Sequence, residues 1–157
     1  MPIPYISSPM QVRSEWIDYN GHMNMAYYNV LFDTASDEFY AEIGVGEQYA
    51  KQRRMTTYTA EFHICYLREL HEHAPVIVHS YLLDFDEKRF HVFQELYHEE
   101  GWLAATGESL ALHIDMAGPR VAPMPEDVVA GMTAFKRKHG ADVWPERAGR
   151  RIGLPGR

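Results

Sequence analysis

The spacing of apolar residues changes along this chain of 157 residues, and each spacing predicts an element. Over residues 10–17, apolar and polar positions alternate loosely, which predicts a half-buried first strand. Over residues 25–43, apolar residues recur every three or four positions with carboxylates on the opposite side, which predicts one long amphipathic helix. Asn24 stands where a helix N-cap is expected, and Gly44 stands where the helix should end.

Four later segments are rich in β-branched and aromatic residues, and short polar junctions separate them, as in an antiparallel meander. They cover residues 56–70, 76–86, 89–99 and 102–115. After two prolines, an apolar stripe predicts a last helix over residues 126–138. This element order predicts an α+β fold in which the long helix lies along the concave face of a curled, five-stranded antiparallel sheet.

The chain shows no boundary between domains before residue 140, because it has neither an internal repeat nor a linker rich in Pro, Gly or Ser. We therefore expect a single domain over residues 1–140 and a basic, Gly-rich tail over residues 141–157. The tail reads RAGRRIGLPGR from Arg147 to Arg157 and lacks hydrophobic periodicity. Such a terminus is typically mobile or draped over a partner.

Composition narrows the possible functions. The formal net charge of −7 opposes a nucleic-acid partner, because proteins that bind polyanions concentrate Lys and Arg on one face. Cys65 is the only cysteine, so one chain can form neither a disulfide nor a multi-cysteine zinc site. No segment reaches the roughly 18 to 20 apolar residues of a membrane span, so we expect a cytoplasmic protein without a membrane partner.

The clearest chemical signal is the segment WIDYNGHMNMAYY, from Trp16 to Tyr28. It predicts a carboxylate, Asp18, at the end of a strand, followed by a turn and the N-terminus of the long helix, where N–H groups stabilise negative charge. Thioester hydrolysis needs a carboxylate that attacks the carbonyl carbon or deprotonates water, and donors for the oxygen that gains charge. D-x-N-G is also an ordinary turn sequence, so the residues alone leave a purely structural Asp18 open.

The same segment resembles the signature Asp-x-x-Gly-His-x-Asn-x-x-x-Tyr of the 4-hydroxybenzoyl-CoA thioesterase-like branch of hotdog-fold proteins. The matches fall at Asp18, Gly21, His22, Asn24 and Tyr28. The resemblance implies a hotdog fold and hydrolysis of an acyl-CoA thioester to a carboxylic acid and CoA. It implies that Asp18 is the general base or nucleophile, and that Asn24 helps to hold the acyl group or water at the helix start.

Other residues of the segment are expected beside the substrate. His22 either keeps the turn in shape or takes part in catalysis directly. Gly21 lies in the turn, and Met25 places its N–H group at the helix start. Tyr28 falls one turn into the helix, where it either packs or contacts the substrate.

A narrower resemblance joins the blocks WIDYNGHM, DEKRFHVFQEL and LALHIDMAGPRVAP to the thioesterases of carnitine breakdown, which are thought to act on betainyl-CoA. Some members of that group are fused to L-carnitine dehydrogenase. This resemblance implies betainyl-CoA as a secondary substrate hypothesis. A trimethylammonium group binds to aromatic rings and negative charge, for which the candidates are Trp16, Tyr19, Tyr27, Tyr58 and Tyr66. Aromatic residues at such spacings are more often core residues.

The segment TTYTAEFHICYL predicts a strand on which Thr57, Thr59, Glu61, His63 and Cys65 share one face. In hotdog dimers the start of this strand approaches the partner's active site, so the resemblance implies that Thr57, Thr59 and Glu61 contact substrate across the interface. Glu61 is either a supporting ion-pair member or a catalyst. The uncovered apolar face and strand edge predict a homodimer or a homotetramer.

The sequence leaves two other functions open. A hotdog-fold hydratase or dehydratase would pair a His with an acid, in local motifs that this sequence lacks. A non-catalytic acyl-CoA-binding module would keep the cleft without the carboxylate, and Asp18 argues against it. The HEH triplet at residues 71–73 lies in an expected loop without a second ligand motif, so we expect no metal and no other cofactor.

Overall fold

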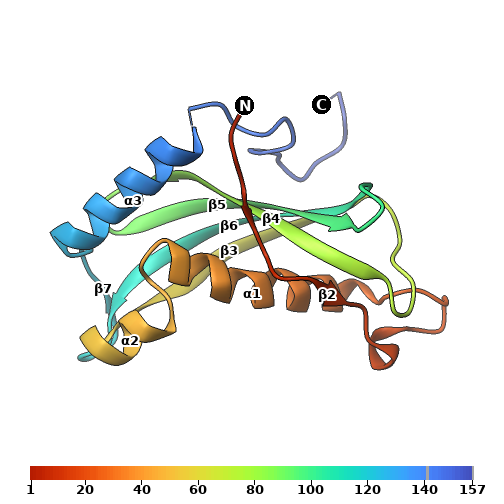
Figure 1. Cartoon of the computed structure of the whole chain (residues 1–157), viewed down its shortest axis with the longest axis horizontal. Coiled ribbons are helices and arrows are strands. Elements are labelled where there is room, and N and C mark those ends of the chain that lie inside the picture. Colours follow the sequence, from red (N-terminus) through yellow and green to blue (C-terminus); the bar gives the residue numbers. More distant parts are fainter. Residues whose placement is uncertain (141, 157) are drawn as a thin grey trace.

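Helix α1 is the centre of the fold and spans Met25–Glu42. The structure is a computed structural model that describes residues 1–140 and 142–156, and in it α1 lies along one face of a sheet (Figure 1). Asn24 caps the helix, because its side chain accepts a hydrogen bond from the Ala26 N–H at 3.0 Å. The predicted helix and its N-cap are confirmed. The buried side of α1 consists of Tyr28, Leu31, Phe32, Ala35 and Phe39.

One antiparallel sheet of seven strands faces this helix. Its four long strands are β3 (Met55–Tyr66), β4 (Pro75–Phe85), β5 (Arg89–His98) and β6 (Leu103–Asp115). They pair in the order β4-β5-β6-β3, so within the described residues β3 has one edge without a strand partner. Strands β4, β5 and β6 form a meander as predicted, but β3 pairs with β6 and not with β4, so the prediction of a four-strand meander is wrong for its first strand. The predicted α+β hotdog class is confirmed.

The N-terminal part of the sheet differs from the single strand predicted over residues 10–17. Two short strands, β1 (Tyr5–Ile6) and β2 (Met10–Gln11), both pair with β4, and a 3-10 turn follows at Ser14–Trp16. Pro9 has no N–H group to donate to a ladder, which explains the break between the two strands. With β7 (Arg120–Val121) on β6, the sheet has seven strands and not five.

Strand β3 is shorter and more irregular than predicted. It ends at Tyr66, because the N–H groups of Leu67 and Arg68 both donate to the Ala104 carbonyl, at 3.0 and 3.1 Å, and the chain leaves the ladder. Its pairing with β6 shifts between Thr59 and Glu61, which leaves Ala60 as a bulge. The bulge reverses the alternation of side chains along the strand.

The bulge overturns the expectation that Thr57, Thr59, Glu61, His63 and Cys65 share one face. Thr59 lies opposite Ala111, a core residue, so Thr57 and Thr59 face α1. Beyond the bulge, Glu61, His63 and Cys65 lie opposite Leu110, Glu108 and Thr106 and face away from α1. Alternation read from the sequence could not reveal one inserted residue.

Two further helices lie at one end of the sheet, near the C-terminal half of α1 (Figure 1). Helix α2 (Glu47–Arg53), which was not predicted, is held to β6 by a 2.7 Å hydrogen bond between the Tyr49 hydroxyl and Nε2 of His113. Helix α3 (Glu126–His139) was predicted to within one residue, and its Phe135 ring lies 5.7 Å from that of Phe39. Across the described residues, no helix is both long and apolar enough to cross a membrane.

Gly107 allows α1 and β3 to approach each other closely at the middle of β6. A Cβ atom there would lie 3.0 Å from Cζ of Phe62 and 3.3 Å from the ring of Phe32, which is fully buried. We expect Gly107→Val to lower the free energy of unfolding by about 1 to 3 kcal/mol, because the core is overpacked. Chemical denaturation measures this change.

Gly131 provides the matched control. It lies in α3 with no atom within 4 Å of an added Cβ, so Gly131→Ala should be neutral or stabilising by up to about 1 kcal/mol. An equal, small effect of both substitutions would contradict the close packing of α1 against β3 and β6.

Candidate active site

A cavity of about 500 Å³ lies between the start of α1 and the loop that follows β3. It is lined by Asp18, Tyr19, Asn20, His22, Met23, Asn24, Met25, Tyr28, Tyr66, Leu67, Arg68 and Glu69. Five of the nine predicted site residues therefore line one cavity, namely Asp18, His22, Asn24, Met25 and Tyr28.

A tight turn presents Asp18 to this cavity. The Asp18 N–H donates to the His22 carbonyl at 3.2 Å, and the Gly21 N–H donates to the Asp18 carbonyl at 3.0 Å. Gly21 has a φ of +83°, a conformation that side chains other than Gly rarely adopt, which explains its place in the motif. Asp18 thus follows the 3-10 turn and the isolated bridge between Ile17 and Met23, and not the strand end that was predicted.

The Asp18 carboxylate is held in place by two donors. Oδ1 accepts from the Asn20 N–H at 2.9 Å, and Oδ2 accepts from Nδ2 of Asn24 at 3.3 Å. Because Oδ1 of Asn24 caps α1 at the same time, one amide side chain connects the carboxylate to the helix start. The carboxylate is half-buried and keeps further lone pairs for a water molecule or a substrate.

Some of the backbone N–H groups at the start of α1 already donate hydrogen bonds within the chain. The Asn24 N–H donates to the Trp16 carbonyl at 2.9 Å, so it is not available to an incoming oxygen. The Ala26 N–H is taken by the Asn24 side chain. Within the described residues the Met25 N–H donates to no acceptor, which leaves it for an oxygen that gains negative charge.

His22 lies beside Asp18 without a side-chain hydrogen bond to it among the described residues. Its ring meets the ring of His71 edge-on, with centroids 6.1 Å apart, and Nδ1 of His71 lies 3.4 Å from the Gly21 carbonyl. The contact between His22 and Asp18 runs through the backbone. The two roles considered for the His22 side chain, in the turn and in catalysis, therefore both stay predictions.

Two tyrosines form one wall of the cavity. Tyr28 accepts the Leu70 N–H at 3.2 Å, and Tyr66 donates to the Met25 carbonyl at 2.9 Å, with the two rings edge-to-face at 5.0 Å. Burial raises the pKa of both phenols above the ordinary value, so both are neutral at physiological pH. Tyr28 thus packs and braces the loop, while the half-exposed Tyr66 faces the cavity.

Of the five aromatic residues considered for a cation cage, Tyr19 and Tyr66 line the cavity. Trp16 and Tyr27 stack on each other at 5.6 Å and pack against the core. Tyr58 lies opposite Leu112 on the other face of the sheet, where it is 50% exposed. A cage in this cavity therefore has fewer rings than the sequence offered.

Arg68 and Glu69 are cavity residues that sequence reasoning missed. The Arg68 guanidinium lies 4.0 Å from the centre of the Trp102 ring, and Trp102 stacks on His98 at 4.7 Å. This stack holds a cation beside the cavity mouth. No local sequence signal marks these residues, because they follow Asp18 by about 50 positions and approach it only in the folded chain.

Thr57, Thr59 and Glu61 do not join the Asp18 cavity within one chain. Thr57 and Thr59 line a separate cavity of about 970 Å³ between α1, α2 and β3, together with Tyr40. Burial raises the pKa of Tyr40 to about 12. Glu61 is exposed on the opposite face of the sheet, so it cannot share a site with the two threonines.

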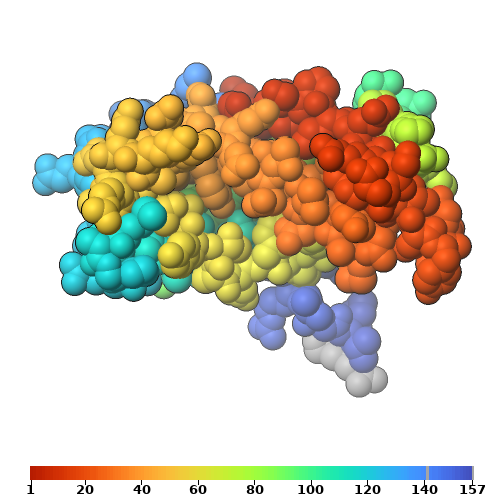
Figure 2. Space-filling model, turned by 90° about the horizontal axis from the view of Figure 1, so that it is seen from below, coloured from red at the N-terminus to blue at the C-terminus, as the bar shows by residue number. Residues whose placement is uncertain are grey.

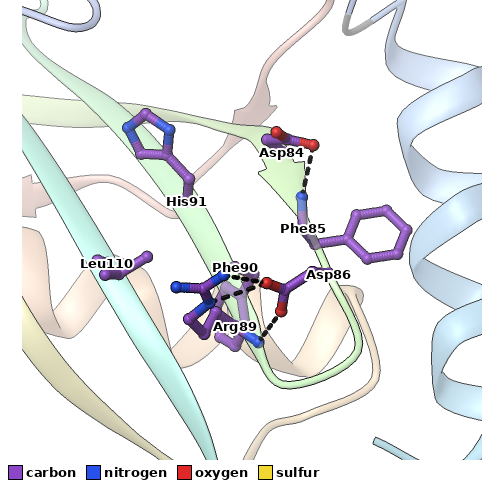
Figure 3. A pocket seen from close by; sticks show the side chains of 7 residues that line it. All are labelled: Asp84, Phe85, Asp86, Arg89, Phe90, His91 and Leu110. Carbon is purple, nitrogen blue, oxygen red and sulfur yellow. Dashed lines mark hydrogen bonds and ion pairs between the residues drawn. The ribbon is translucent and has the colours of Figure 1, made fainter.

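Another pocket, of about 290 Å³, lies at the turn between β4 and β5 (Figure 3). Asp86 fills the turn: its carboxylate accepts hydrogen bonds from the Arg89 guanidinium at 2.8 and 2.5 Å and from the Lys88 N–H at 2.9 Å. The Arg89 guanidinium holds the pKa of Asp86 below the usual value. This carboxylate is committed to the turn and is a poor candidate base.

Across residues 1–140 and 142–156, no group of three His, Cys, Asp or Glu side chains is placed to hold a metal ion. The HEH triplet contributes one weak contact, 3.5 Å between His73 and Glu72. The Asp18 cavity instead combines a carboxylate, an amide, a free helix N–H group and a guanidinium. Such a set of groups can direct water or a carboxylate at a carbonyl and bind an anionic substrate.

The family follows from the sequence match that accompanies this fold and cavity. Residues 12–132 match the model of the thioesterase-like superfamily, and this range contains α1 and strands β3 to β7. The chain belongs to this superfamily, and it is a hotdog-fold thioester hydrolase that acts on acyl-CoA.

Individual relatives are consistent with this family. The chain is 39% identical to a betainyl-CoA thioesterase of Pseudomonas aeruginosa, over 92% of this chain and 91% of the relative. It is 34% identical to an L-carnitine dehydrogenase/betainyl-CoA thioesterase of Rhizobium meliloti, of which it spans 29%.

Solved structures show the same fold. A Staphylococcus aureus protein solved in complex with CoA superposes with a TM-score of 0.86 at 31% identity and 99% coverage of both chains. A putative thioesterase of Pseudomonas putida superposes with a TM-score of 0.82, also at 31% identity and 99% coverage of both chains.

Two substitutions at Asn24 separate capping from the contact with Asp18. Asn24→Ala removes both and should lower the free energy of unfolding by about 0.5 to 2 kcal/mol. Asn24→Asp keeps a cap oxygen for the Ala26 N–H but replaces the donor to Asp18 with a second carboxylate. We expect Asn24→Asp to unfold like the wild type and to lose at least about tenfold in turnover.

Thermal melting and steady-state hydrolysis of an acyl-CoA, measured on the same preparations, test this prediction. A fully active Asn24→Asp variant would show that the donor from Asn24 to Asp18 is unimportant for the reaction.

Proposed function

We propose that Asp18 is the carboxylate that drives thioester hydrolysis in this protein. The observation that carries the proposal is the position of Asp18, which lines a cavity beside the α1 N-terminus while Asn20 and Asn24 fix both of its oxygens. A carboxylate held by two donors keeps one orientation toward a substrate, as a base or nucleophile requires.

The proposed reaction consumes one water molecule per thioester. Asp18 either takes a proton from water as it adds to the carbonyl carbon, or adds to that carbon itself and is released when water attacks the anhydride. In both routes the C–S bond breaks, the sulfur leaves as CoA thiolate and accepts a proton, and the acyl group leaves as a carboxylate. The Met25 N–H is the proposed donor to the carbonyl oxygen as it gains charge. No metal or other cofactor takes part.

Asp18→Asn tests the role of the carboxylate, because it keeps the shape and most of the turn while removing the charge. Hydrolysis should fall by at least about a hundredfold, whereas melting temperature and affinity for acyl-CoA should change little. Free-thiol release from an acyl-CoA and calorimetric binding measure the two quantities.

Asp86→Asn is the matched control. Asp86 accepts a backbone N–H two residues further on at 2.9 Å, just as Asp18 does, but it lies at the remote turn of Figure 3. This variant should retain its turnover. Near-normal turnover of Asp18→Asn, with binding intact, would instead favour a role for Asp18 in the turn alone.

We further propose that the acyl group is betainyl. The support is the 39% identity to a betainyl-CoA thioesterase and a cavity in which the Tyr66 and Tyr19 rings accompany the Glu69 carboxylate. A quaternary ammonium group is attracted by aromatic faces and by negative charge. Arg68, held over Trp102 beside the same cavity, is the proposed contact for the phosphates of CoA.

Two thioesters whose acyl groups have the same shape test whether the protein recognises the positive charge of the betainyl group. Betainyl-CoA and 3,3-dimethylbutanoyl-CoA differ only in a nitrogen cation against a neutral carbon, so kcat/KM should be at least about tenfold higher for betainyl-CoA, equivalent to about 1.4 kcal/mol. Tyr66→Leu should reduce this preference, and Tyr66→Phe should keep it because the ring remains. Equal kcat/KM for both esters would exclude recognition of the cation.

We propose that the protein is a cytoplasmic homodimer joined along β3, with a homotetramer as the higher assembly. The free edge of β3 exposes unpaired N–H and C=O groups along a strand of 12 residues, which favours pairing with another strand. The cavity with Thr57 and Thr59 opens beside this edge. Pairing of two copies would bring these threonines toward the other copy's Asp18, as the resemblance implied. Neither nucleic acid nor membrane is a proposed partner.

A further inference from the structure

The C-terminal segment, residues 142–156, is anchored on the outer face of the sheet, opposite α1 (Figure 1). Trp144 meets the His91 ring edge-on at 5.2 Å. The Gly149 N–H donates to both carboxylate oxygens of Glu108, at 2.8 and 3.0 Å. Glu108 also lies 2.7 Å from Nε2 of His91, so the two anchoring residues support each other. The segment is therefore fixed as far as Gly149.

Beyond Gly149 the chain leaves its own sheet. In Figure 2, which views the molecule from the side of α1, the C-terminal segment projects past the yellow strand β3. Ile152 is 87% exposed and Leu154 is 66% exposed, so this chain gives neither residue a packing surface. Arg150 and Arg151 are exposed as well, and within the described residues they form no ion pair.

The outer face of β3 offers a complementary set of groups. Tyr58 is 50% exposed there, and Glu61 is exposed and makes no ion pair with any described residue. Both side chains lie on the outer face of the sheet, opposite α1, where the C-terminal segment also lies. An aromatic ring and a carboxylate on this face match two apolar residues and two guanidinium groups on the projecting segment.

The geometry points to a second copy of this chain as the partner of that segment. When two β3 edges pair about a twofold axis perpendicular to the sheet, the outer faces of both sheets lie on the same side. A segment that crosses its own outer face and passes the β3 edge then reaches the outer face of the other copy. We propose that residues 150–156 bind there, with Ile152 and Leu154 on Tyr58 and the two arginines beside Glu61. This inference rests on the proposed β3 dimer.

Charge reversal in two separate variants tests whether the contact runs between copies. The first variant carries Arg150→Glu together with Arg151→Glu, and the second carries Glu61→Arg. In each homodimer, like charges then face each other at both contacts, whereas in the mixed dimer unlike charges face each other at both contacts. Mixed in equal amounts, the two variants should form mostly the mixed dimer by native mass spectrometry. Contacts within one copy would give about half mixed dimer, the statistical share, and would overturn the inference.

The apolar part of the contact is tested with Ile152→Asp combined with Leu154→Asp. This variant should raise the dimer dissociation constant at least about tenfold in sedimentation measurements. Ile6→Asp is the control, since Ile6 is 54% exposed on β1 at the opposite edge of the sheet and should leave the constant nearly unchanged. If the wild type is dimeric and the tail substitutions leave its dissociation constant unchanged, the proposed contact of residues 150–156 is overturned and the β3 dimer is not. A monomeric wild type would overturn the β3 dimer itself.

Discussion

The hydrogen-bonding requirement at the start of α1 is the constraint on which the site depends. An α-helix begins with N–H groups that have no acceptor inside the helix. Asn24 satisfies one of them with its Oδ1 atom, and its Nδ2 atom then points to Asp18 at 3.3 Å. An Asp at this position would cap as well but would offer no donor. The residue that begins the helix therefore also orients the carboxylate.

The loop after β3 completes the same site from a distant part of the sequence. The Met23 N–H donates to the Leu70 carbonyl at 2.7 Å, and the Leu70 N–H donates to the Tyr28 hydroxyl at 3.2 Å. Leu70 is fully buried, so the loop is fixed against the turn that carries Asp18. Arg68 and Glu69 reach the cavity as a consequence. Core packing and backbone hydrogen bonds thus decide which charges surround the carboxylate.

Local signals predicted the elements whose conformation is decided locally. The Asn24 cap and the three- and four-residue spacing identified α1, and the short polar junctions identified the meander of β4, β5 and β6. The turn signature also predicted that the carboxylate, its amide partner and the helix start lie together, because all of them belong to one short segment. The features that the sequence did not predict depend on contacts between residues that are distant in the chain. The bulge at Ala60 is set by the register with β6, and the cavity role of Arg68 is set by the path of a loop.

In the proposed dimer, the bulge lets β3 present Thr59 to one face of the joined sheet and Glu61 to the other. Before Ala60, Thr57 and Thr59 face α1; after it, Glu61 faces outward. In an antiparallel pair of β3 strands, the start of one lies beside the end of the other, where Tyr66 lines the Asp18 cavity. The threonines of one copy then lie on the same side of the joined sheet as the other copy's Asp18. Without the inserted residue, regular alternation would place Thr59 and Glu61 on the same face, so Glu61 could not face outward while Thr59 faces α1.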